Sequence, residues 1–264
     1  MPNFAANLTL MFNEYEFLDR FAAAARAGFR GVEYLFPYAH PAERLAEELG
    51  KHRLTQVLFN LPAGDWGKGE RGIACHPDRV TEFRDGIAEA IRYAHTLGCT
   101  RVNCLAGIAP VGVPVEKVHE TLVENLRYAA LALARAQIRL MLEPINTRDI
   151  PGFFVNRTAQ ALMIMDAAGS DNIALQYDAY HMQIMEGDLA HTIQARLDRI
   201  GHIQIADTPG RHEPGTGEIN HEFLFRHIEG LGYRGWIGCE YKPAARTEEG
   251  LGWFSAYRVR AAAA

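Results

Sequence analysis

The chain has 264 residues, of which 48% are hydrophobic and 22% are charged, and its formal net charge is −5 at pH 7. This balance is typical of a globular protein with an apolar core. No nucleic-acid partner is expected, because binding to phosphates requires clustered lysine and arginine and the sequence contains no basic run. A small-molecule partner is expected instead.

Neither a signal peptide nor a membrane partner is predicted. Residues 1–7 lack a basic segment followed by an apolar one. No apolar run approaches the roughly 18 residues of a membrane span. The cysteines form no C-x-x-C pair and are expected to be reduced and mostly buried; they are Cys75, Cys99, Cys104 and Cys239. A cytoplasmic protein is predicted, and no feature of the sequence indicates an oligomeric state.

Short apolar runs alternate with helix-period stretches along the whole chain. The predicted strands are residues 5–10, 31–36, 54–60, 101–105, 139–143, 173–178, 202–206 and 236–240. The predicted helices are residues 16–27, 41–51, 78–97, 115–136, 158–168, 189–199 and 220–231. Four glycines stand where helix C-terminal caps are expected, and these are Gly28, Gly50, Gly98 and Gly232.

This alternation indicates a parallel sheet, which is either open and doubly wound or closed into a barrel. A dinucleotide-binding open sheet should carry a G-x-G-x-x-G turn after its first strand, and none is present there. Eight units in about 260 residues are typical of a barrel. Since no linker or break in composition is visible, we predict a single (β/α)8 TIM barrel, with residues 1–264 as one catalytic domain.

The longest irregular stretch, residues 61–77, follows the third predicted strand. Four glycines in it alternate with charged residues and one tryptophan. A loop of this length in a compact domain usually serves as a lid or is disordered, and the tryptophan among charges favours a lid. We expect residues 65–74 to close over the substrate, with Trp66 excluding water and Arg71 binding a substrate carboxylate.

The last four predicted strands each end in an oxygen-bearing side chain: Glu143, Asp178, Gln204 and Glu240. Strand ends line the active-site mouth of a barrel, so neighbouring ones can converge on one point. Three carboxylates there would raise one another's pKa, a cost that a cation removes. Carboxylate and amide oxygens suit Mg²⁺ or Mn²⁺. The alternative, four unrelated polar residues, does not account for the matching positions.

Three further side chains are expected at the same rim. His181 follows Asp178 by three residues and would orient a ligand or contact substrate oxygens; a structural role is the alternative. Arg211 lies in a Gly/Pro-rich loop that could hold its guanidinium over the site, although a solvated loop arginine is also possible. Arg211 and Lys242, together with Arg71, supply positive charges. A carboxylate-bearing substrate needs such charges, and a neutral ketose does not.

These residues lie in segments that resemble the sugar isomerase/epimerase barrels of the xylose isomerase-like type, and among them the hydroxypyruvate isomerase family. The general resemblance covers residues 143–146, 176–181, 202–207, 214–219 and 240–243. The more specific part, residues 59–66 and 69–74, resembles that family's third-strand loop. Coverage extends from about residue 5 to residue 257.

The resemblance implies one Mg²⁺ or Mn²⁺ ion held by Glu143, Asp178, Gln204 and Glu240. It also implies that Glu143 and Glu240 act as proton donor and acceptor. Ketose 3-epimerase relatives usually place histidine where this chain has Gln204, which makes the predicted site harder and disfavours a free-sugar epimerase.

The implied reaction converts a small hydroxy-keto acid, most simply hydroxypyruvate, to tartronate semialdehyde through an enediolate. A metal-assisted hydride shift is the alternative to proton transfer. A 2-oxo-tetronate isomerase, which acts on a four-carbon acid, and a ketose 3-epimerase or a dehydratase of the same superfamily are rival enzymes. A catalytically silent sugar-acid binding protein is a rival outside enzymology. A DNA-repair nuclease is disfavoured by the acidic charge and by the lack of histidines for a multi-zinc cluster.

Overall fold

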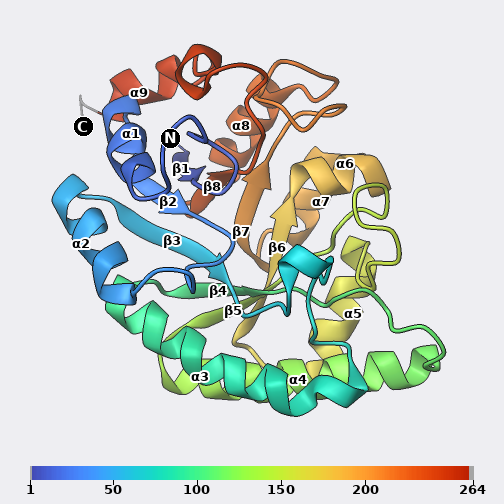
Figure 1. Ribbon diagram of the computed structural model, residues 1–264. Coiled ribbons are helices and arrows are strands. Elements are labelled where there is room, and N and C mark those ends of the chain that lie inside the picture. The colour runs from blue at the N-terminus through green and yellow to red at the C-terminus, as the bar shows by residue number, and fades with distance from the viewer. Residues whose placement is uncertain (1, 262–264) are drawn as a thin grey trace.

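The computed structural model describes residues 2–261. Its eight parallel strands pair in chain order and close into a barrel. The strands are β1 (Asn3–Asn7), β2 (Gly31–Glu33), β3 (Thr55–Asn60), β4 (Arg101–Cys104), β5 (Arg139–Leu142), β6 (Ile173–Asp178), β7 (Ile200–Ile205) and β8 (Trp236–Cys239). The barrel closes where β8 pairs with β1. Figure 1 shows the helices arranged outside this ring of strands. The predicted (β/α)8 barrel is confirmed.

The α-helices are α1 (Asp19–Ala27), α2 (Ala42–His52), α3 (Val80–Leu97), α4 (Val115–Arg135), α5 (Thr158–Ala168), α6 (Ala179–Met185), α7 (Leu189–Arg196), α8 (His221–Gly230) and α9 (Ser255–Ala261). Short 3-10 helices are η1 (Trp66–Lys68), η2 (Pro77–Arg79) and η3 (Thr247–Gly250). One predicted cap was wrong: α2 continues through Gly50 to His52, and Arg53 adopts the left-handed conformation that ends it. Helix α6 was missed because seven residues are too few for a periodic pattern.

The interior of the barrel is apolar at one end and polar at the other. Ala5, Val57 and Met141 form a small buried cluster against which Trp236 packs. By contrast, the first four strands carry buried polar side chains at or next to their carboxyl ends, namely Asn7, Glu33, Asn60 and Asn103. Polar side chains therefore line the carboxyl end of the barrel on β1–β4 as well as on β5–β8. The apolar cluster lies beneath them.

A second, larger apolar core lies between the barrel and the helices around it. Phe12, Phe21 and Leu45 are among its fully buried side chains. The four cysteines are buried and free, as expected. Within residues 2–261, no helix has both the length and the apolar character needed to cross a membrane.

Asp207 organises the loop that follows β7. Its buried carboxylate accepts backbone hydrogen bonds from Thr208 and Ile219 on one oxygen, and from Gly215 and Gly217 on the other, at 2.8–3.1 Å. The Asp207 carboxylate therefore binds backbone N–H groups at four positions along the Gly/Pro-rich segment. The loop is held in a single shape, and that shape presents Arg211 to the mouth of the barrel.

We expect Gly217→Ala to destabilise the fold by about 1–3 kcal/mol, the usual cost of overpacking. A Cβ atom at this position would lie 2.2 Å from the Thr208 carbonyl oxygen and 2.7 Å from Asp207 Oδ1. Thermal unfolding followed by circular dichroism should show a lowered Tm. Gly230→Ala is the matched control, because a Cβ atom there meets nothing within 4 Å. Equal Tm values for the two variants would contradict this account of the loop.

Candidate active site

Four buried side chains converge at the carboxyl end of the barrel. Glu143, Asp178, His181 and Glu240 each offer one ligand atom, and these atoms all lie within 4.8 Å of one another. Glu143 and Glu240 directly follow β5 and β8, whereas Asp178 is the last residue of β6. No residue of the four is more than 5% exposed. The structure thus brings together the three carboxylates that sequence reasoning placed at strand ends.

Asp178 both ends β6 and begins α6. Its Oδ1 accepts hydrogen bonds from the backbone N–H groups of Tyr180 at 2.7 Å and His181 at 3.4 Å. This capping interaction fixes the carboxylate and also turns His181 back toward the site. Its other oxygen, Oδ2, is buried and accepts no hydrogen bond from any residue between 2 and 261. That oxygen is available to a cation or to a substrate hydroxyl.

The hydrogen bonds of His181 define which of its ring nitrogens carries the proton. Asn146 Nδ2 lies 2.6 Å from His181 Nδ1, and the orientation of this amide is fixed because its Oδ1 accepts from the backbone N–H of Asp149. Nδ1 is therefore an acceptor, and in the neutral ring the proton is on Nε2. Nε2 lies 3.5 Å from Asp178 Oδ2 and 4.0 Å from Glu143 Oε1. In this tautomer His181 is a hydrogen-bond donor toward the site.

Burial dominates the electrostatics of the cluster. It raises the pKa of Glu143 well above the usual range, and repulsion from Glu240 and Asp178 adds to this effect. Burial likewise raises the pKa of Asp178 and brings that of Glu240 to about 8, in both cases against the opposing charge of Arg211. The pKa of His181 falls well below its usual value because burial, and then Arg211, disfavours the cation. The imidazole is therefore neutral at pH 7.

Arg211 enters the site from the loop after β7, as predicted. It adopts a left-handed backbone conformation with φ 57°. Its Nη2 donates a short hydrogen bond to Glu240 Oε2 and lies 3.8 Å from Asp178 Oδ2. The guanidinium also stacks over the ring of Tyr180, with 5.0 Å between Cζ and the ring centre. One fixed positive charge thus faces the three carboxylates.

Gln204 lies on β7 next to the cluster and is 1% exposed. Its Nε2 donates to Glu33 Oε1 at 2.7 Å, and its Oε1 accepts from Gln176 Nε2 at 2.6 Å. The amide oxygen that sequence reasoning assigned to a metal is therefore hydrogen-bonded to a neighbouring side chain here. Its role as a ligand remains a prediction.

The donor set fits a hard divalent cation. The residues that would hold it are Glu143, Asp178 and Glu240, with the amide oxygen of Gln204 as a fourth donor. The unbonded Oδ2 of Asp178 supports this fit, because a buried carboxylate oxygen normally has a partner. No cysteine contributes, so the site does not have the character of a structural zinc site.

The loop after β3 is anchored at one end and exposed at its tip. Arg71 stacks on Trp66, with 4.2 Å between Cζ and the ring centre, and donates to two backbone carbonyls of the same loop. Ile73 and Ala74 are buried, and Gly72 packs so closely on the β4 loop that a Cβ atom would lie 2.4 Å from the Leu105 carbonyl oxygen. Residues 72–74 are thus packed against the barrel, and closure of residues 65–74 over the substrate remains a prediction.

Lys242 has an exposed side chain. It contacts Arg211 through its backbone, whose N–H donates to the Arg211 carbonyl at 2.8 Å. Among the residues that sequence reasoning missed, Asn103 donates to Glu143 Oε2 at 2.8 Å and Asn7 donates to Glu240 Oε1 at 3.2 Å. The strand-end criterion did not find them because the first and fourth strands were predicted to extend to residues 10 and 105, whereas β1 ends at Asn7 and β4 at Cys104.

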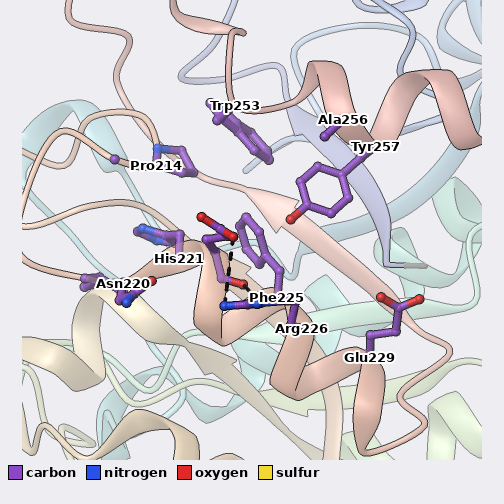
Figure 2. A pocket seen from close by; sticks show the side chains of 12 residues that line it. Pro214, Asn220, His221, Phe225, Arg226, Glu229, Trp253, Ala256 and Tyr257 are labelled. Carbon is purple, nitrogen blue, oxygen red and sulfur yellow. Dashed lines mark hydrogen bonds and ion pairs between the residues drawn. The ribbon is translucent and has the colours of Figure 1, made fainter.

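A cavity of about 510 Å³ lies elsewhere, between α8, the segment before it and the C-terminal segment (Figure 2). Phe225, Trp253 and Tyr257 form its aromatic walls, and Arg226 pairs with Glu222 one turn earlier on α8. None of the predicted site residues lines this cavity. The candidate active site is therefore the strand-end cluster.

Comparisons with known proteins show which family the chain belongs to. A family model described as a xylose isomerase-like TIM barrel matches residues 21–257. The chain is 56% identical over 258 residues to hydroxypyruvate isomerase of Escherichia coli (strain K12), covering 98% of this chain and 100% of that protein. It is 49% identical over 260 residues to 2-oxo-tetronate isomerase of Cupriavidus necator, with coverage of 98% and 100%. The crystal structure of an AP endonuclease, family 2, from Brucella melitensis matches with a TM-score of 0.95 at 49% identity, covering 98% of this chain and 100% of that one. The chain therefore belongs to the xylose isomerase-like TIM barrel family, as its motifs predicted.

Proposed function

We propose that this protein is a metal-dependent isomerase of a small hydroxy-keto acid and that it converts hydroxypyruvate to tartronate semialdehyde. The observation that carries the proposal is the buried cluster of Glu143, Asp178, His181 and Glu240 within 4.8 Å. The 56% identity to a hydroxypyruvate isomerase supports the choice of substrate.

The reaction moves a proton between neighbouring carbons. One carboxylate takes the proton from the hydroxymethyl carbon to give an enediolate and returns it to the former carbonyl carbon, while the hydroxyl proton passes between the two oxygens. Glu143 and Glu240 face the same point and are the candidate bases. His181 donates its Nε2–H to a substrate oxygen, and Arg211 attracts the substrate carboxylate. A bound Mg²⁺ or Mn²⁺ would supply Lewis-acid polarisation of the carbonyl.

Three alternative functions are less well supported than this one. The 49% identity to 2-oxo-tetronate isomerase favours a four-carbon acid as the second candidate substrate. A ketose 3-epimerase is less well supported, since a neutral sugar would not use the positive charge of Arg211. The Brucella relative is called an AP endonuclease, yet this chain is acidic and has one histidine in its cluster. Nothing here favours a phosphate backbone as ligand.

We expect kcat/KM to be highest for hydroxypyruvate, lower for a four-carbon 2-oxo acid and at least roughly tenfold lower for fructose, because fructose lacks the charge-assisted pair with Arg211. Steady-state assays at saturating Mn²⁺ measure the three values. Chelator-treated enzyme is the control and should lose activity toward all three. A kcat/KM for fructose at least tenfold higher than that for hydroxypyruvate would instead assign the enzyme to the ketose epimerases.

We expect Glu143→Gln and Glu240→Gln each to lower kcat by roughly 10² or more, the lower range for loss of a general acid or base. Because both are also proposed ligands, bound Mn²⁺ must be quantified in the same samples. Glu222→Gln, on the exposed surface of α8, is the matched control and should retain wild-type kcat. A site variant that keeps full activity with full metal occupancy would remove that residue from the mechanism.

A further inference from the structure

A further buried carboxylate lies beside the candidate active site. Glu33 is the last residue of β2 and is 0% exposed. Its Oε1 accepts hydrogen bonds from Asn7 Nδ2 at 3.2 Å and from Gln204 Nε2 at 2.7 Å. Its Oε2 lies 2.8 Å from His202 Nε2. Side chains from β1, β2 and β7 therefore meet on one carboxylate.

The barrel is shaped to admit this carboxylate. The pairing of β2 with β3 shifts register between Val32 and Glu33, an irregularity of the kind that re-aims a side chain. On β8, a Cβ atom at Gly238 would lie 2.4 Å from Glu33 Oε1. Because Gly238 has no side chain, β8 leaves room for the Glu33 carboxylate. Any larger residue at position 238 would displace that carboxylate.

The first consequence concerns Gln204. The Gln204 amide presents its nitrogen to the accepting oxygen of Glu33. Its oxygen then points the other way, where it accepts from Gln176 Nε2 at 2.6 Å. Gln176 itself follows a second register shift, in the pairing of β6 with β7. The direction of the Gln204 oxygen is therefore set by Glu33.

The second consequence concerns Glu240. The Nδ2 group of Asn7 donates to Glu33 Oε1 and to Glu240 Oε1, each at 3.2 Å. The amide of Asn7 cannot turn over freely, because its Oδ1 accepts from the backbone N–H of Thr9 at 3.1 Å. Asn7 thus bridges the two carboxylates and transmits the position of Glu33 to Glu240.

If Glu33 served only to pair with His202 in the fold, that role would explain only one of the contacts of its carboxylate. The opposite end of the barrel is filled by apolar residues, and buried ion pairs rarely stabilise a fold more than apolar packing does. We propose that Glu33 is a positioning residue: it orients the Gln204 amide and, through Asn7, the Glu240 carboxylate. This inference rests on the proposed function, since it takes Gln204 and Glu240 as parts of the working site.

The experiment measures Mn²⁺ affinity by electron paramagnetic resonance of the free ion. Glu33→Gln replaces a carboxylate oxygen by an NH₂ group beside the donating amides of Asn7 and Gln204, and we expect it to weaken Mn²⁺ binding by at least roughly tenfold, the lower range for loss of a partner that orients a ligand. In a Gln204→Ala background the same change should weaken binding by a smaller factor, because part of its effect passes through Gln204. Equal factors in the two backgrounds would overturn the assignment.

Glu48→Gln is the matched control. Glu48 is a buried acid on α2 that pairs with Arg44 at 2.8 Å, so its loss should lower the Tm and leave Mn²⁺ affinity unchanged. If Glu33→Gln does not fold, Glu33→Asp is measured in its place, since it keeps the charge and withdraws the carboxylate by one methylene. Wild-type Mn²⁺ affinity in a folded Glu33 variant would overturn this inference alone. A wild-type protein that binds no Mn²⁺ would overturn both this inference and the metal-dependent function.

Discussion

Three buried carboxylates share one small volume at the mouth of this barrel, and the rest of the site depends on how their repulsion is offset. Two like charges about 4 Å apart repel by roughly 4 kcal/mol at an effective dielectric constant of 20. His181 does not relieve this cost, because burial keeps its ring neutral. Arg211 supplies one positive charge, which leaves a net charge of −2 when all three carboxylates are ionised. A divalent cation matches that charge.

The surrounding hydrogen bonds hold each member of the cluster in place. Asp207 shapes the loop that delivers Arg211, and Asn146 fixes the tautomer of His181. The network around Glu33 reaches Glu240 from the other side of the barrel. Each of these partners is buried and polar: Glu33 lies on β2, and Asp207 and Asn146 lie in the loops that follow β7 and β5. A site built in this way is preorganised, which is what charge stabilisation during a reaction requires.

The fold was predictable because the alternation of strands and helices is a local pattern repeated eight times. The three carboxylates were predictable for a related reason: parallel strands bring their carboxyl ends to one rim. Arg211 was placed correctly from its loop composition, although its left-handed backbone was not foreseen. Glu33 was missed because its role depends on a register shift and on the empty space at Gly238. Both are properties of strand pairing across the barrel, which a single sequence does not display.

The proposed chemistry depends on one divalent cation bound by the carboxylate cluster. Crystals of the protein soaked in Mn²⁺ and measured for anomalous scattering test it most directly. We expect one strong peak bounded by Glu143, Asp178 and Glu240, with the Gln204 amide oxygen as a further ligand. No peak among these residues, or a peak only at another site, would contradict it.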